Sequence, residues 1–314
     1  MSSLLRLSAL TLFISLALIS ATLGVPIDSE LQAATLVERQ NGFAPRDTAT
    51  IFPGVNTNTA GGSCTSNFIF TDGPNLYIGQ AAHCSSTGQA TETNGCTPGA
   101  SLPEGTPVNI TGATRPGVLA YNSWVRMSRN GETDQNACNF NDFALVRIDP
   151  ADKGRVNPTI PTFGGPTGVR QRTSPLGNNE PIYSYGNSVL RQGLTFLSPK
   201  YGLNVATQNG GWDHNTYTFT PGIPGDSGSG FVDSQGRAYG VLSTLQFAPR
   251  PLSNGVADLP LALQYLYRSP DFANLRLVPG TAPFRVALPS LGSLFGGGAK
   301  AASQRSVTLK DLKA

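Results

Sequence analysis

Short apolar runs separated by turn-forming residues cover the chain from about residue 50 to residue 250. The clearest runs are 67–70, 76–78, 107–110, 118–121 and 143–148. Their lengths suit strands and are too short for most helices. The polar cluster 233–237 separates two further apolar runs, 231–232 and 238–242, as the turn of a β-hairpin would. Short strands at this spacing predict an all-β barrel or sandwich.

One helix is predicted after these runs, near residue 260. Asp258 is suited to cap it, Pro260 to its first turn and Pro270 to its end. Three- and four-residue spacing gives it an apolar face made of Leu263, Leu266 and Tyr267.

The first 24 residues have the pattern of a secretory signal peptide. Arg6 precedes an apolar stretch, 7–19, that is too short to span a bilayer comfortably. Small residues follow, and cleavage near Ala21 or Gly24 would suit them. An uncleaved anchor is the alternative. We therefore predict a secreted, extracellular protein with no membrane attachment after signal removal.

Two further segments flank the predicted folded domain, 47–285. Residues 25–46 are interpreted as a propeptide with cleavage after Arg39 or Arg46, and a mature N-terminal arm is the alternative. Residues 286–314 are Gly- and Ser-rich with a basic end, which is typical of a flexible tail.

Composition supports a globular protein without an electrostatic surface for nucleic acid. Charged residues are 13% and hydrophobic residues 39% of the 314 residues, and the formal net charge is +3. The tail accounts for that charge, with one acid, Asp311, against the four bases Lys300, Arg305, Lys310 and Lys313. The rest is nearly neutral, so nucleic acid is not an expected partner.

Export would permit disulfides and glycosylation. The four cysteines are Cys64, Cys84, Cys96 and Cys138, for which the residues alone leave three pairings open. Asn109 begins an Asn-Ile-Thr acceptor site for N-glycosylation.

The candidate chemistry centres on Ser227, which lies among three glycines in Gly225–Gly230. A serine hydroxyl needs a base near neutral pKa, and the chain has only two histidines, His83 and His214. The backbone N–H groups of Gly225 and Ser227 could form an oxyanion hole. For the carboxylate that orients the base, Asp142 is preferred to Asp134 and Asp149, because only Asp142 opens an apolar run.

These residues lie in three motifs that resemble those of chymotrypsin-like serine proteases. Residues 81–84 (Ala-Ala-His-Cys) resemble the histidine motif, 141–145 (Asn-Asp-Phe-Ala-Leu) the aspartate motif and 225–230 (Gly-Asp-Ser-Gly-Ser-Gly) the serine motif. The order His, Asp, Ser also matches that family and differs from subtilisin and α/β-hydrolase orders. The residues after Ser227 are more similar to secreted fungal and bacterial members than to animal digestive ones.

The resemblance implies two packed antiparallel six-stranded β-barrels with a C-terminal helix and a site between the barrels. It implies His83 as general base and acid, Asp142 as its orienting group and Ser227 as the nucleophile. It also implies the disulfide Cys64–Cys84 and, with it, Cys96–Cys138.

Two departures from the family limit what the resemblance implies. The chain lacks an Ile-Val-Gly-Gly-like start whose new amine could pair with Asp226, so zymogen activation by that route is not expected. Asp226 is expected to make a buried structural contact instead. The family's pocket base aligns with Pro221, where an acid selective for Arg or Lys is missing.

The remaining pocket positions are Ser243, Thr244 and Leu245, which align with the substrate-pairing strand. Leu245 predicts a shallow pocket for small or apolar side chains. A glutamate-specific pocket would place a histidine just before Ser243, where Leu242 stands, so His214 is expected to be a surface or loop residue. Trp124 and Trp212 are expected in the core or at the rim.

The leading hypothesis is a monomeric secreted serine endopeptidase that acts on protein or peptide substrates. A catalytically inactive, protease-like secreted binding protein is the alternative. A lipase or esterase would need Gly-x-Ser-x-Gly around Ser227, and Ser229 breaks that pattern. No residue pattern points to a metal or an organic cofactor.

Overall fold

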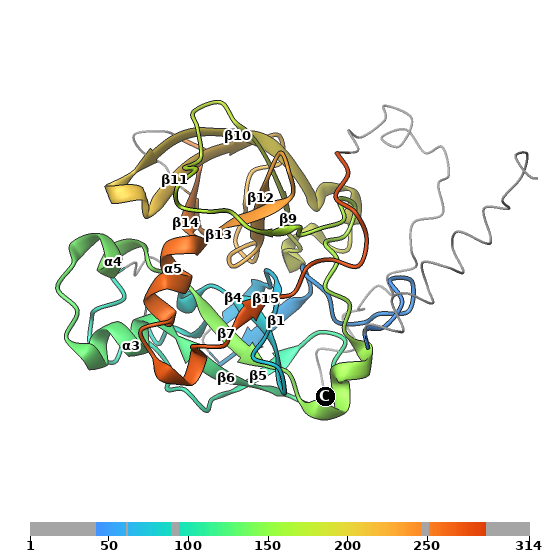
Figure 1. Cartoon of the computed structure of the whole chain (residues 1–314), viewed down its shortest axis with the longest axis horizontal. Coiled ribbons are helices and arrows are strands. Elements are labelled where there is room, and N and C mark those ends of the chain that lie inside the picture. Colours follow the sequence, from blue (N-terminus) through green and yellow to red (C-terminus); the bar gives the residue numbers. More distant parts are fainter. Residues whose placement is uncertain (1–41, 61, 89–93, 246–250, 287–314) are drawn as a thin grey trace, which may run out of the picture.

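The computed structural model describes residues 42–60, 62–88, 94–245 and 251–286. The predicted signal peptide, residues 25–41 of the predicted propeptide and residues 287–314 of the predicted tail lie outside the described residues. Within the described ranges, no helix has the length and apolar character required to cross a membrane. Two β units lie one above the other in Figure 1, with one helix beside their junction.

The first unit is an antiparallel sheet of eight strands that curls on itself. Its strands are β1 (Asn56–Thr59), β2 (Gly62–Thr65), β3 (Ile69–Thr71), β4 (Leu76–Gln80), β5 (Pro107–Ile110), β6 (Gly117–Asn122), β7 (Ala144–Arg147) and β15 (Arg276–Leu277). They pair in the order β15-β3-β4-β7-β6-β5-β1-β2. Backbone bonds of Asn67 and Phe68 to Gly79 continue the β3–β4 pairing toward β2. Counted as one bent strand, β2 and β3 close a six-stranded barrel.

The second unit is a sheet of seven strands, six of which close into a barrel. Its strands are β8 (Gly168–Val169), β9 (Pro181–Tyr185), β10 (Pro199–Gln208), β11 (Asp213–Thr218), β12 (Gly230–Asp233), β13 (Arg237–Leu245) and β14 (Asn254–Asp258). The ring β9-β10-β11-β14-β13-β12 closes because β12 pairs with both β13 and β9, and β8 adds a short parallel pairing to β13. The predicted all-β fold with two barrels is confirmed.

Three hydrophobic clusters explain why the chain folds into these two units. Buried Ile and Val residues such as Ile78 and Val146 fill the first barrel. Aromatic and aliphatic residues such as Phe231 and Tyr239 fill the second. A larger, aromatic-rich cluster holds the two units together, and it includes Phe143 of the first and Tyr183 of the second. Burial of aromatic side chains of this size dominates such interfaces.

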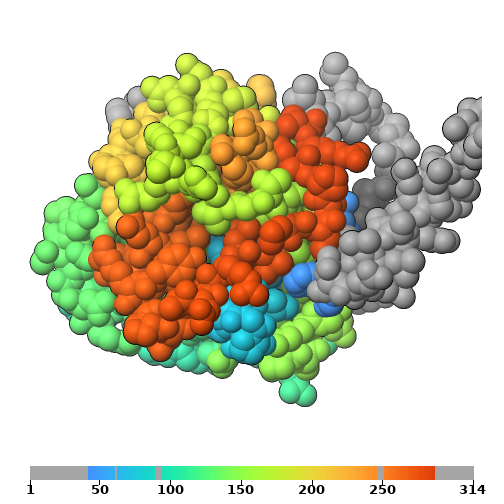
Figure 2. All heavy atoms as spheres, in the orientation of Figure 1, coloured from blue at the N-terminus to red at the C-terminus, as the bar shows by residue number. Residues whose placement is uncertain are grey.

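The predicted helix is confirmed as α5 (Leu259–Leu266). The Asp258 carboxylate accepts a hydrogen bond of 2.7 Å from the Leu261 N–H and so caps it. Leu263 and Leu266 pack into the cluster between the barrels. Tyr267, predicted on the same face, is 42% exposed because it lies just past the last helical turn. In Figures 1 and 2 the orange α5 region covers one side of the junction.

Two helices were not predicted: α3 (Ser123–Asn130) and α4 (Gln135–Phe140). The Asn122 side chain caps α3, and Gly131 ends it at a φ of +62°. Only Trp124 and Met127 anchor α3 deeply in the core, so its apolar pattern is too sparse to detect. Both tryptophans are core residues, as expected.

Both disulfides implied by the resemblance are present. Cys64–Cys84 joins β2 to the turn after β4, and Cys96–Cys138 joins residue 96 to α4. The first disulfide closes a loop of 20 residues and the second a loop of 42 residues. On the loop-entropy model, each contributes about 3–4 kcal/mol to stability.

The described chain ends in a strap, residues 276–285, that crosses both barrels. Its β15 pairs with β3, its Ala282 carbonyl accepts from the Gly165 N–H at 2.9 Å, and its Arg285 N–H donates to the Phe163 carbonyl at 2.7 Å. Asn157, in the connection between the barrels, donates through Nδ2 to the Ala44 carbonyl (2.7 Å) and to Thr281 Oγ1 (3.2 Å). One buried amide therefore holds both ends of the described chain.

Candidate active site

His83 is fixed at the end of β4 by a short 3₁₀ turn, residues 82–85. The turn is held from both sides, since Cys84 is bonded to Cys64 and the Cys84 carbonyl accepts from the Thr59 hydroxyl. Ala82 is fully buried, and its small side chain lets the turn pack closely against Trp124. The imidazole keeps a fifth of its side-chain surface exposed.

Asp142 lies in the connection from α4 to β7 and is 3% exposed. Its carboxylate accepts a hydrogen bond from the backbone N–H of His83 at 2.9 Å and one from the ring Nδ1 of His83 at 2.6 Å. The Ser243 hydroxyl donates to the same carboxylate at 2.6 Å. These three bonds fix the imidazole and its tautomer, because the Nδ1 proton must face Asp142. Of the two rival acids, Asp134 caps α4 and Asp149 caps the turn at 150–155.

The electrostatics of this pair favour a charged Asp142 beside a basic His83. Burial alone would lower the pKa of His83, but the charge and hydrogen bond of Asp142 outweigh it and raise that pKa. Burial opposes ionisation of Asp142, yet His83 and the Ser243 hydroxyl bring its pKa below the usual value. A proton arriving on the imidazole is therefore stabilised by a neighbouring carboxylate.

The Ser227 loop packs directly against the strand that leads to His83. The Ser227 carbonyl accepts from the Thr65 N–H at 2.9 Å, and Thr65 adjoins the Cys64–Cys84 disulfide. Gly228, at a φ of +87°, has no room for a side chain, since a Cβ there would lie 2.9 Å from the Ala81 nitrogen and 2.5 Å from the Thr65 carbonyl. Glycine is required because the loop and the His83 strand approach so closely.

The nucleophile, the base and the oxyanion-hole donors predicted for this site are free of hydrogen bonds to other described residues. Among the described residues, neither His83 Nε2 nor Ser227 Oγ has a hydrogen-bond partner. The N–H groups of Gly225 and Ser227 also donate to no other described residue. Bonds between nucleophile and base are often long in free enzymes and tighten on substrate binding.

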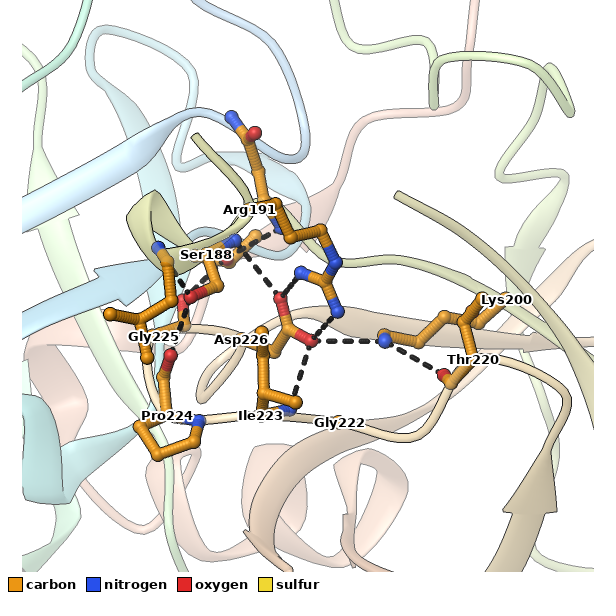
Figure 3. A network of polar contacts seen from close by, with 12 residues as sticks. Ser188, Arg191, Lys200, Thr220, Gly222, Ile223, Pro224, Gly225 and Asp226 are labelled. Carbon is orange, nitrogen blue, oxygen red and sulfur yellow. Dashed lines mark hydrogen bonds and ion pairs between the residues drawn. The ribbon is translucent and has the colours of Figure 1, made fainter. Parts of the chain in front are cut away.

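A buried network of charges supports the Ser227 loop from behind (Figure 3). Arg191 donates through both terminal nitrogens to the Asp226 carboxylate, at 2.5 Å for Nη2. Lys200 Nζ lies 2.9 Å from the same carboxylate. The N–H groups of Ser188 and Ile223 complete the shell at 3.0 and 3.1 Å. The expected structural contact of Asp226 is confirmed, and two internal cations occupy its carboxylate.

Arg191 and Lys200 had no signal in the sequence. They precede Asp226 by 35 and 26 residues, within a segment whose apolar pattern did not predict strands. A lysine in a strand is normally exposed, whereas Lys200 has no exposed side-chain surface. Gly186 makes room for the network, because a Cβ there would lie within 2.7 Å of Asp226 and Lys200 atoms.

The predicted pocket residues come from two adjoining segments of the second barrel. Ser243, Thr244 and Leu245 end β13, where Leu245 lies opposite Asn254 of β14. Pro221 precedes Gly222, whose N–H donates to Asn254 Oδ1 at 3.2 Å. The structure thus brings Pro221 beside the β13–β14 pair. Ser243 also has the unpredicted role of donating to Asp142.

His214 and Asn109 are two further residues with a predicted location. His214 was expected at the surface, which is wrong: it is 2% exposed on β11, and both ring nitrogens are bonded, to Thr207 Oγ1 and to Asp258, each at 2.9 Å. A histidine with an apolar environment and two partners can lie in a barrel interior. Asn109, the predicted glycosylation acceptor, is exposed on β5.

One group of possible metal ligands lies at the site, namely Cys64, His83 and Cys84. The two cysteines form a disulfide with each other, so neither can supply a thiolate.

Comparison with known proteins gives structural likenesses only. No family model matches the chain, and no curated protein matches it. Thermobifida fusca protease A has a TM-score of 0.47 and 17% identity, covering 74% of this chain and 100% of its own. Cellulomonas bogoriensis chymotrypsin has a TM-score of 0.43 and 17% identity over 73% and 98%. Nocardiopsis protease has a TM-score of 0.41 and 19% identity over 73% and 99%. With TM-scores below 0.5, these likenesses decide nothing about activity.

Proposed function

We propose that the protein is a secreted serine endopeptidase that hydrolyses peptide bonds through an acyl-enzyme formed on Ser227. The observation that carries the proposal is the His83–Asp142 pair, bonded at 2.6 Å and oriented so that Nε2 is left for the nucleophile. The Ser227 loop packs on the strand that leads to this histidine.

The mechanism follows from the chemistry of these groups. His83 Nε2 takes the proton of Ser227 Oγ as the oxygen attacks the scissile carbonyl, and Asp142 stabilises the imidazolium that forms. The N–H groups of Gly225 and Ser227 donate to the carbonyl oxygen as it becomes negative. His83 then gives its proton to the leaving amine, which leaves the acyl group on Ser227. Water, activated by the same histidine, releases the second product.

Activation would not depend on a freed amino terminus. Arg191 and Lys200 already form ion pairs with the Asp226 carboxylate. A new N-terminal amine would therefore find that carboxylate already paired. Removal of a propeptide would therefore not be needed to complete the ion pairs of Asp226. Cleavage after Arg39 suits the fold better than cleavage after Arg46, since Ala44 is bonded to Val156 and Asn157.

The test is covalent labelling of the secreted full-length product with a fluorophosphonate probe, compared with Ser227→Ala. We expect the wild-type protein to be labelled and to cleave unfolded protein, and the variant to do neither. If the folded wild-type protein takes no label and cleaves nothing, the endopeptidase proposal fails and the inactive binding protein is favoured.

A further inference from the structure

We propose that the pocket for the residue before the scissile bond selects an acidic side chain and rejects Arg and Lys, with Lys200 and Asn254 as the residues that determine this specificity. The inference rests on the proposed function.

The first observation is a buried excess of positive charge behind the pocket. Lys200 has no exposed side-chain surface and donates to the carbonyls of Thr220 and Pro221 at 3.0 and 3.1 Å. Figure 3 shows it beside the carboxylate of Asp226, which also binds Arg191. Among the described residues, Asp226 and Arg191 are the charged groups that act on Lys200. Two cations against one carboxylate leave one positive charge next to Pro221.

The second observation is an unused hydrogen-bond donor beside Gly222. Asn254 is fully buried, and its Oδ1 accepts from the Gly222 N–H (3.2 Å) and the Thr218 hydroxyl (3.3 Å). Its Nδ2 has no partner among the described residues. A Cβ on Gly222 would lie only 2.8 Å from that nitrogen, so the amide faces the Pro221–Gly222 segment. A buried donor without an acceptor is costly, and a substrate acceptor would remove that cost.

Both observations favour the same class of side chain. A carboxylate is attracted by the excess charge and accepts from the amide. A carboxamide offers the acceptor without the attraction. A guanidinium or ammonium offers no acceptor and is repelled. Small apolar side chains, expected from Leu245 alone, would leave the Asn254 amide unpaired.

The first experiment compares kcat/KM at pH 6.5 for peptides that differ only before the scissile bond, with Glu, Gln, Leu, Ala or Arg there. We expect the order Glu, Gln, then Leu and Ala, with Arg lowest and about 100-fold or more below Glu. An enzyme that takes the fluorophosphonate label but prefers Leu, Ala or Arg would contradict the specificity while leaving the proposed function intact. An unlabelled protein would contradict the proposed function itself.

Two variants separate the charge from the donor. Lys200→Met should lower the Glu-to-Arg ratio about tenfold, whereas the control Lys153→Met should leave it unchanged. Lys153 is a suitable control because it also donates to a carbonyl, that of Pro74, on the first barrel. Asn254→Asp keeps the acceptor for Gly222 but loses the donor and adds a negative charge, so it should shift preference toward Arg. Labelling by the probe verifies that each variant has folded, and a folded Asn254→Asp that still prefers Glu would overturn the role of Asn254.

The wild-type protein offers a test that needs no substitution. Burial lowers the pKa of Lys200 to about 8, against the opposing effect of Asp226. Lys200 is therefore protonated below that pH and loses its charge above it. The Glu-to-Arg ratio should fall between pH 7 and pH 9.5, and the titration of His83 cancels because it affects both substrates alike. A ratio that stays constant or rises would contradict the role of Lys200.

Discussion

The two histidines of this chain lie in similar pairs with opposite consequences. His83 binds Asp142 through Nδ1 at 2.6 Å and leaves Nε2 without a described partner. His214 binds Asp258 through Nε2 at 2.9 Å and Thr207 through Nδ1 at the same distance. An imidazole with both nitrogens engaged cannot pass a proton to a substrate. A carboxylate beside an imidazole therefore does not by itself make a general base, because the second ring nitrogen must also be free.

The positions of the two pairs in the fold match this difference. His83 keeps part of its side chain exposed at the end of β4, next to the loop of Ser227. His214 packs edge-on against Tyr239, at a ring distance of 5.3 Å, inside the second barrel. Asp258 also caps α5, so the His214 pair links the barrel wall to the helix.

The largest expected effect is the difference in activity between a variant at His83 and a variant at His214. His83→Ala should reduce kcat by about 10⁶-fold, as removal of the base does in comparable triads. His214→Gln, the control at the other histidine, should keep kcat within about tenfold of the wild-type value, counted per molecule that takes the fluorophosphonate label. Single-turnover kinetics with a fluorogenic protein substrate would measure both, and equal losses would show that the two pairs do not differ in function.

The next effect compares the two carboxylates. Asp142→Asn should lower kcat about 10⁴-fold, because the amide favours the wrong tautomer of His83. Asp258→Asn should change kcat little, since it touches neither His83 nor Ser227. Chemical denaturation of Asp142→Asn controls for folding. Activity near the wild-type level in that variant would remove Asp142 from the mechanism.

For stability, the His214–Asp258 pair is expected to matter more than the Ser227 side chain. Asp258→Ala should lower the free energy of unfolding by about 2–3 kcal/mol, from a lost buried hydrogen bond to His214 and a lost helix cap. Ser227→Ala, which removes no side-chain hydrogen bond to another described residue, should change it by less than about 0.5 kcal/mol. Urea unfolding followed by fluorescence gives both values, and an unchanged Asp258→Ala protein would refute the structural role of the second pair.

The smallest effect is in pH dependence. His83 must be neutral to accept a proton, and Asp142 raises its pKa above the ordinary value of 6.5. The acid limb of kcat/KM should therefore lie above pH 6.5, and residual activity in Asp142→Asn should have its limb at lower pH. Profiles from pH 4 to 8 would show the shift, and a limb below 6.5 in the wild-type protein would contradict the assigned electrostatics.

The sequence predicted the parts of this molecule that depend on local pattern. The run at 143–148, the 233–237 hairpin and the Asp258 cap each signal their own structure through neighbouring residues. Contacts across long separations had no such signal. The partners of Asp226, the burial of His214 and the unused amide of Asn254 all result from barrel closure, which brings together residues without a common local pattern.

Asn157 has a consequence for survival in a protease-rich medium. Proteolysis of a folded protein favours termini and loop tips that open locally. Here the arm at Ala44 and the strap at Thr281 share one buried amide, so neither end is released unless a contact inside the molecule breaks. Under the proposed function, the two ends of the described fold would thereby resist digestion by other copies of the chain.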